Sequence, residues 1–145
     1  MVMNIVIASD HAGYELKKVL VDYFIAKNYE IKDLGPYEPA SVDYPDYAHK
    51  LAEMVEKGEY KFGISICGSG NGINITVNKH QGIRSALCWN TKIAELARLH
   101  NDANIIALPA RFISEQEAKD IVEVFLSTGF EGGRHERRIR KIPCV

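Results

Sequence analysis

The sequence predicts an α/β protein in which a parallel sheet of five strands is covered by helices on both faces. Two observations lead to this fold class. Short apolar runs typical of buried strands alternate along the chain with segments whose apolar residues recur every three or four positions, as in amphipathic helices. No repeat, low-complexity segment or linker interrupts the 145 residues. We therefore expect one three-layer α/β/α domain over residues 1–145, with a Rossmann-like or flavodoxin-like strand order.

The first half of the chain alternates between three predicted strands and two predicted helices. Apolar runs predict strands at residues 4–8, 30–34 and 62–67. The spacing of apolar residues predicts helices over 16–24 and 48–55. Three prolines and a glycine between residues 35 and 45 predict a loop before the second helix.

The second half continues this alternation, with strands expected at 83–88 and 103–108. A helix should follow the turn at 68–72 as far as about Lys79, and another should cover 93–100. Ser114 is expected to begin the next helix in a capping box with Glu117, three residues later. The basic segment after residue 133 is expected to form a short C-terminal helix.

Composition and charge exclude several classes of partner. The net charge is −1, which gives no reason to expect a nucleic acid or a membrane, so an anion must bind to a local cluster. Three cysteines leave an odd thiol, and no secretory signal precedes the first strand, so we expect free thiols and a cytoplasmic location. No Cys/His spacing matches a structural zinc site, and we predict neither a metal nor a cofactor.

The glycine-rich turn after the third predicted strand is the strongest local signal of a site. Gly68, Gly70 and Gly72 let the backbone come close to a ligand. N–H groups at the start of the following helix would attract a phosphate or the oxyanion of a reaction intermediate. The alternative is a glycine turn without function, and the pattern is neither a Walker loop nor a dinucleotide-binding fingerprint.

Cys67 is the last residue of the strand that enters this turn. A thiol beside a helix N-terminus has a lowered pKa and can act as a base or a nucleophile. An inert buried cysteine is the alternative. We favour such a structural role for Cys88 and Cys144.

Two histidines are candidates for proton transfer. His11 follows Asp10 at the end of the first strand, where the carboxylate could orient the imidazole. Alternatively, Asp10 caps the next helix and His11 is a surface residue. His100 lies on the apolar face of its helix and could equally be a core or interface histidine, whereas His49 and His80 are expected at the surface.

A local basic cluster lies near the C-terminal end of the chain. On a helix, Arg134 and Arg138 are four residues apart and project from one face, where two guanidinium groups suit a phosphate. A solvated basic tail is the alternative. An arm that binds nucleic acid is disfavoured, because the cluster is short and lacks interleaved aromatic residues.

Six stretches, in order along nearly the whole chain, resemble the ribose-5-phosphate isomerase B family. They are residues 9–13 (SDHAG), 41–46 (SVDYPD), 67–72 (CGSGNG), 78–84 (NK and GIR), 100–104 (HNDAN) and 132–138 (GGRH and Arg138). Ser69 stands where many members have threonine and keeps the hydroxyl, and Val77 replaces a common alanine. Cys67 argues against the related galactose-6-phosphate isomerase subunits, which lack a cysteine at the turn.

The resemblance implies a role for each matched site residue. Cys67 would move a proton between carbons 1 and 2 of the sugar, and His100 would help to open the furanose ring with Asp10 and Ser69. The backbone of residues 68–72 would stabilise the enediolate. The implied substrate-binding residues are Asp10, His11, Tyr44, Gly68, Ser69, Gly70, Asn71, Gly72, Asn101, Arg111, Arg134 and Arg138, with His11 and the three arginines around the phosphate.

The resemblance also implies a homodimer, or a tetramer, in which residues 100–101 and the C-terminal residues complete the site of the neighbouring subunit. The expected activity is interconversion of ribose 5-phosphate and ribulose 5-phosphate in the non-oxidative pentose phosphate pathway. Two alternatives stay open: an isomerase of a six-carbon aldose phosphate such as allose 6-phosphate, and a non-catalytic module that binds a phosphosugar or a nucleotide. A thiol redox protein is disfavoured, since no resolving cysteine lies near Cys67.

Overall fold

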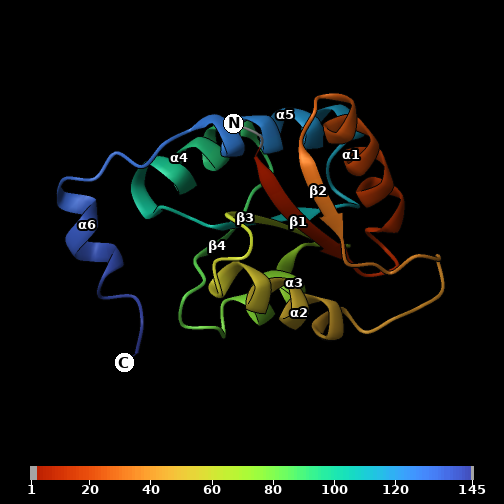
Figure 1. Ribbon diagram of the computed structural model, residues 1–145, viewed down its shortest axis with the longest axis horizontal. Coiled ribbons are helices and arrows are strands. Elements are labelled where there is room, and N and C mark those ends of the chain that lie inside the picture. Colours follow the sequence, from red (N-terminus) through yellow and green to blue (C-terminus); the bar gives the residue numbers. More distant parts are fainter. Residues whose placement is uncertain (1–2, 145) are drawn as a thin grey trace.

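Strands and helices alternate along the chain as the sequence predicts (Figure 1). The computed structural model describes residues 3–144, so Met1, Val2 and Val145 lie outside the described part. The strands are β1 (Asn4–Ser9), β2 (Glu30–Asp33), β3 (Phe62–Cys67), β4 (Ser85–Leu87) and β5 (Ile105–Pro109). The helices are α1 (Tyr14–Ala26), α2 (Tyr44–Glu56), α3 (Asn71–Val77), α4 (Thr91–Asn101), α5 (Glu115–Ser127) and α6 (Arg134–Ile139).

The five strands form one sheet with the order β2-β1-β3-β5-β4, and every pair is parallel. This confirms the predicted fold class. The flavodoxin-like order 2-1-3-4-5 is wrong for the last two strands, which are exchanged. Burial explains the exchange, because all five residues of β5 are buried between two neighbours, whereas the three residues of β4 are half-buried at an edge.

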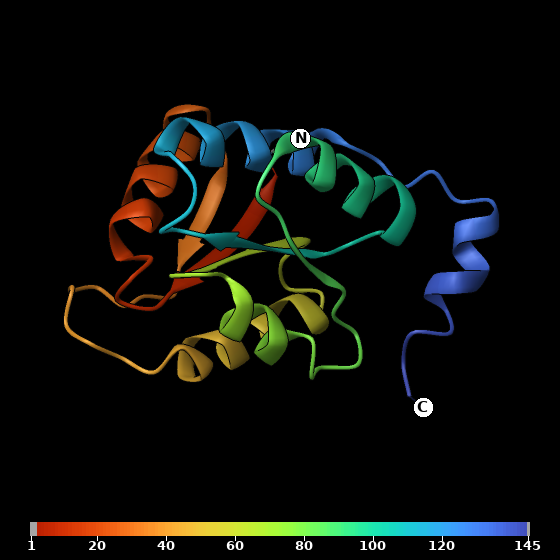
Figure 2. The same ribbon diagram turned by 180° about the vertical axis from the view of Figure 1, so that it is seen from behind.

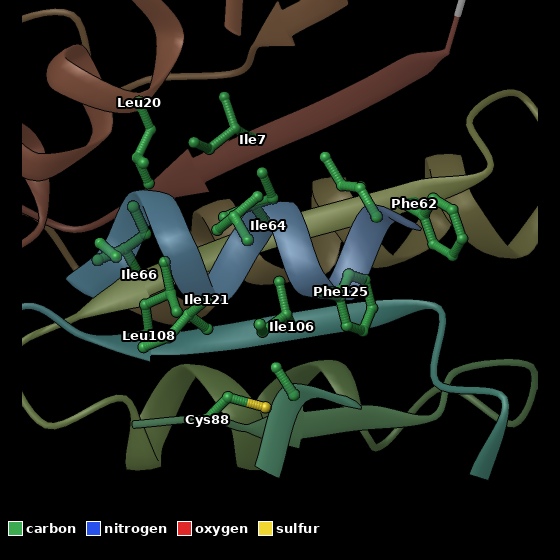
Figure 3. Close-up of a cluster of buried hydrophobic side chains, with 14 of the residues drawn as sticks. Ile7, Leu20, Phe62, Ile64, Ile66, Cys88, Ile106, Leu108, Ile121 and Phe125 are labelled. Carbon is green, nitrogen blue, oxygen red and sulfur yellow. The ribbon is translucent and has the colours of Figure 1, made fainter. Parts of the chain in front are cut away.

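Helices cover both faces of the sheet (Figures 1 and 2). On one face, side chains of β1, β3 and β5 pack against α1, α4 and α5, and Figure 3 shows this cluster. Phe62 and Phe125 meet edge to face there, with ring centroids 5.4 Å apart. A second cluster fills the opposite face, between the sheet and the helices α2 and α3.

The helix ends agree with the predicted capping. Ser114 Oγ accepts a hydrogen bond from the Glu117 amide, and the Glu117 carboxylate accepts one from the Ser114 amide, so the predicted capping box is confirmed. The backbone N–H at position 102 closes the last turn of α4. Among residues 3–144 there is no helix with the length and apolar character needed to cross a membrane.

Because all strands are parallel, the two ends of the strands form two different edges of the sheet. All strands end at one edge, the carboxyl edge, and each helix then runs back toward the other, the amino edge. The last residue of α4 is Asn101, only four positions before β5 begins, so the end of α4 lies at the amino edge. Helix α6 stands away from the layers and packs beside α4 (Figures 1 and 2).

Candidate active site

A cleft opens at the carboxyl edge, beside the glycine-rich turn that is predicted to form the site. It has a volume of about 490 Å³. Its walls come from the ends of β1, β3 and β5 and from the start of α2. The lining residues are Asp10, His11, Ala12, Tyr44, Cys67, Gly68, Ser69, Gly72, Arg111 and Phe112.

Cys67 is one of the residues that line this cleft. Cys67 is the last residue of β3 and is only 5% exposed. The chain then turns through Gly70, whose φ of 77° is the left-handed conformation that glycine adopts readily. The sequence therefore places a nucleophilic atom at the end of a buried strand, directly before a tight turn.

The glycine turn also presents backbone donors. Ser69 Oγ accepts a hydrogen bond from the Asn71 amide at 3.2 Å, and the first helical bond of α3 runs from Asn74 N to Gly70 O. Within the described part of the chain, the amides of Gly72 and Ile73 have no hydrogen-bond partner, as expected for the first turn of a helix. Such N–H groups can bind an anionic oxygen.

Arg111 brings a positive charge to the same turn. Its amide donates to Gly68 O at 3.0 Å, and the preceding amide, at Ala110, donates to Cys67 O at 2.9 Å. A Cβ atom at position 68 would lie 3.1 Å from the Arg111 guanidinium. The glycine thus lets the arginine side chain lie close against the backbone of the turn.

The pair Asp10–His11 is arranged differently from the expected carboxylate–imidazole contact. Asp10 is buried, and its carboxylate accepts a hydrogen bond from the Gly13 amide at 3.0 Å, which stabilises the turn into α1. The alternative of Asp10 as the N-cap of α1 is wrong, because Gly13 holds that position, and Asp10 instead stabilises the turn before it while lining the cleft. His11 is held by the loop before α2, since the Val42 amide donates to His11 Nδ1 at 3.3 Å.

Tyr44 and Phe112 form the apolar part of the wall. A Cβ atom at Gly72 would lie 2.5 Å from the ring of Tyr44, so this ring packs directly on the glycine turn. Phe112 was missed by the sequence analysis, and it is 75% exposed at the rim of the cleft. Its position directly after Arg111, beyond the end of a predicted strand, is the signal that could have identified it.

Several predicted site residues do not reach the cleft of their own chain. Gly70 and Asn71 belong to the glycine turn but do not line the cleft. His100 and Asn101 end α4 at the amino edge, and Arg134 and Arg138 lie on α6 beside α4. Strand β5 alone separates the two edges by about 13 Å, at roughly 3.3 Å per residue.

Arg134 and Arg138 are both exposed, as predicted for a phosphate-binding pair or a solvated tail. The helix itself is confirmed over Arg134–Ile139. Asn101 lines a separate hollow of about 330 Å³ at the amino edge, together with Arg84.

The remaining histidines form two clusters that the sequence did not reveal. His100 stacks on His135 with ring centroids 4.3 Å apart, and the Glu131 carboxylate lies beside both rings. Burial, and then the nearby His100 and Arg134, lower the pKa of His135 below its usual value. In the second cluster, His49 Nδ1 and His80 Nε2 lie 2.8 Å apart on the surface.

The other two cysteines fit the structural role expected for them. Cys88 is fully buried against the sheet, and this burial raises the pKa of its thiol to about 12. Cys144 is exposed near the end of the described chain. Cys67 is therefore the one cysteine of the described residues that lines the carboxyl-edge cleft.

These features define a class of protein: an α/β protein whose sheet-edge cleft combines a thiol, a carboxylate, an imidazole and a guanidinium group around a glycine turn. Such a set can bind a small anion and transfer protons on it. Known proteins define the class more closely. The sequence profile described as Ribose/Galactose Isomerase matches residues 5–142, and the chain belongs to this family.

Individual relatives agree with this assignment over nearly their full lengths. A Mycoplasma genitalium protein named probable ribose-5-phosphate isomerase B is 46% identical, over 98% of this chain and 95% of its own. Ribose-5-phosphate isomerase B of Escherichia coli is 39% identical, also over 98% and 95%.

Solved structures give the same result. The crystal structure of a ribose 5-phosphate isomerase from Thermotoga maritima superposes with a TM-score of 0.97 at 52% identity and covers 99% of both chains. The Mycoplasma genitalium ribose-5-phosphate isomerase B, solved with bound ribulose-5-phosphate, gives a TM-score of 0.93 at 45% identity, over 98% of this chain and 95% of its own.

Proposed function

We propose that this protein is an aldose–ketose isomerase that interconverts D-ribose 5-phosphate and D-ribulose 5-phosphate. The observation that carries the proposal is the position of Cys67, whose thiol lies in the carboxyl-edge cleft at the entry to the glycine turn. Membership of the Ribose/Galactose Isomerase family supports the same reaction. A carbon-bound proton can be moved only by an oriented base next to a group that stabilises the oxyanion, and this arrangement provides both.

The proposed reaction proceeds through a cis-enediolate. The Cys67 thiolate takes the proton from carbon 2 of the open aldose, and the electron pair of that bond moves into a carbon–carbon double bond. Free amides of the glycine turn, such as that of Gly72, stabilise the negative oxygen that forms. Cys67 then returns the proton to carbon 1, while the hydroxyl proton passes from oxygen 2 to oxygen 1 with the help of Ser69 or Asp10. The atoms balance without a metal or a cofactor.

The phosphate would bind at the mouth of the cleft. His11 and Arg111 line it from the same chain, and the exposed Phe112 and Tyr44 border it. Binding energy from the non-reacting phosphate would hold the open sugar against Cys67. His11 and Arg111 alone leave the site with fewer charges than the family resemblance implies.

We propose that a second copy of the chain supplies the missing groups. His100 and Asn101, together with Arg134 and Arg138, lie at the amino edge, about 13 Å or more from the cleft along β5. In a homodimer, His100 of the partner subunit would protonate the ring oxygen, and Arg134 and Arg138 of the partner subunit would contact the phosphate. A tetramer would be a pair of such dimers.

In this proposal the chain acts as one domain in the cytoplasm, within the non-oxidative pentose phosphate pathway. Steady-state kinetics on a panel of aldose phosphates is the direct test. We expect the highest kcat/KM with ribose 5-phosphate. A higher kcat/KM with allose 6-phosphate would identify a six-carbon isomerase instead, and binding without turnover of any sugar phosphate would identify a non-catalytic module.

A further inference from the structure

A cluster of potential metal ligands lies outside the cleft, at the amino edge. It joins His100 at the end of α4, Glu131 in the segment before α6, and His135 in α6. Glu131 Oε2 is 4.0 Å from His100 Nε2, and Glu131 Oε1 is 3.7 Å from His135 Nε2. One ligand atom from each of the three residues lies within 4.8 Å of the other two.

The buried imidazole of His135 points to a missing ligand in this cluster. The side chain is 7% exposed, and its Nε2 atom is fully buried without a hydrogen-bond partner among residues 3–144. The Glu131 carboxylate lies 3.7 Å from this atom, which is beyond hydrogen-bonding distance. Buried polar atoms in native proteins nearly always have a partner, so this nitrogen is suited to receive one.

The segment that carries Glu131 is fixed against α4. The Glu131 amide donates to Leu99 O at 3.0 Å, which places the carboxylate beside the end of α4. His100 and Glu131 are both partly exposed, whereas His135 is buried. The cluster therefore has a closed inner side and an outer side that is open to solvent.

We propose that His100, Glu131 and His135 bind a divalent transition-metal ion of the zinc type, with the fourth position open to solvent. Two imidazoles and one carboxylate form a donor set typical of zinc. Bond lengths near 2.0–2.2 Å place tetrahedral ligand atoms about 3.3 Å apart. The ligand atoms lie within 4.8 Å of one another, so they must move closer together by at most about 1.5 Å to reach this separation.

Metal binding also requires the His100 ring to turn. A metal ion bonds in the plane of an imidazole, and the two stacked ring planes are now only 13° from parallel. His100 has room to rotate, since its side chain is 38% exposed, while the buried His135 stays in place. Bound metal would thus hold His100 in an orientation different from the stacked one.

The consequence for activity rests on the proposed function. If His100 protonates the ring oxygen of a substrate in the neighbouring subunit, it cannot do so while a metal ion occupies its Nε2 atom. Zinc should therefore act as a reversible inhibitor, and a chelator should restore the activity. The metal is not needed for the reaction, so a chelator alone should leave the metal-free enzyme unaffected.

Cobalt titration of the full chain tests the site without reference to activity. We expect one Co²⁺ per chain, with visible absorption typical of tetrahedral nitrogen and oxygen ligands, and displacement by Zn²⁺. Glu131→Gln and His135→Gln should each weaken binding at least about tenfold, which corresponds to about 1.4 kcal/mol. His80→Asn, which removes the surface His49–His80 pair, and Cys67→Ala, which removes the thiol of the cleft, should leave the affinity unchanged.

The outcomes separate the two proposals. Unchanged cobalt affinity in the exposed Glu131→Gln variant, confirmed in folded His135→Gln, would overturn the metal site. The inhibitory role is wrong if zinc binds at this site but the isomerase rate does not fall. It is also wrong if the Glu131→Gln variant is half inhibited at the same zinc concentration as the wild type. A wild-type chain without isomerase activity would refute the proposed function, and the cobalt titration would still test the site.

Discussion

The carboxyl-edge cleft and helix α6 are held by the fold in very different ways. In the cleft, Cys67 is buried at the end of a strand, and the ring of Tyr44 packs against Gly72 so closely that a Cβ atom there would lie at 2.5 Å. Helix α6 has six residues, stands away from the sheet, and keeps its arginines exposed. Cleft residues are thus fixed by packing at the sheet edge, whereas the arginines of α6 lie on a surface helix.

Removal of the Cys67 thiol should have the largest effect on activity. The loss of a general base typically lowers the rate about 100- to 10,000-fold. Cys67→Ala should therefore lose nearly all turnover while it still binds ribulose 5-phosphate, as measured by steady-state kinetics and calorimetry. Cys144→Ala, which removes an exposed thiol that does not line the cleft, is the matched control. Near-wild-type turnover of Cys67→Ala would refute the role of Cys67 as the base.

A smaller effect is expected from the arginines of α6. Arg138→Ala should raise KM or the dissociation constant roughly 10- to 150-fold, because a charge-assisted bond to phosphate is worth about 1.5–3 kcal/mol. Arg138→Lys should recover only part of the loss, since lysine keeps the charge without the bidentate geometry. Arg140→Ala, at the C-cap of the same helix, is the control, because Arg140 is paired with Glu136 at 3.0 Å. Equal effects at both positions would favour the solvated tail.

Mixing of subunits tests whether the two regions meet in a dimer. A Cys67→Ala chain and an Arg138→Ala chain are each defective alone. In a heterodimer with shared sites, one site carries both defects and the other carries neither. Purified heterodimers should therefore recover about half of the wild-type activity. If verified heterodimers stay inactive, the arginines act within their own chain.

The smallest expected effect concerns stability and compares two glycines with similar backbone angles. Gly70 in the cleft has φ 77°, and Gly132 before α6 has φ 74°. A Cβ atom added at Gly70 would lie 2.4 Å from the side chain of Leu87. A Cβ atom added at Gly132 would meet no neighbouring group within 4 Å. Gly132→Ala should cost only the left-handed strain, about 1–2 kcal/mol. Gly70→Ala should cost about 1–3 kcal/mol more, for overpacking, and urea unfolding curves would measure the difference.

The alternation of apolar runs and amphipathic segments was enough to predict the strands and helices of this fold. It did not predict that β5 lies between β3 and β4. Cleft residues at strand ends, such as Cys67 and Arg111, were predictable because parallel strands end at one edge. The cluster of His100, Glu131 and His135 could not be predicted from the sequence, because it depends on how α6 packs against α4.

The hydrogen bond from the Val42 amide to His11 has a consequence for the chemistry of the cleft. A neutral imidazole has one nitrogen that accepts and one that carries hydrogen. Because Nδ1 accepts from Val42, the neutral ring is fixed as the tautomer with its hydrogen on Nε2. His11 can then donate to a phosphate oxygen without first gaining a proton. Val42 has no acidic or basic side chain. Its backbone amide, in the loop before α2, nevertheless determines that the His11 Nε2–H group is the donor that the cleft presents to a ligand.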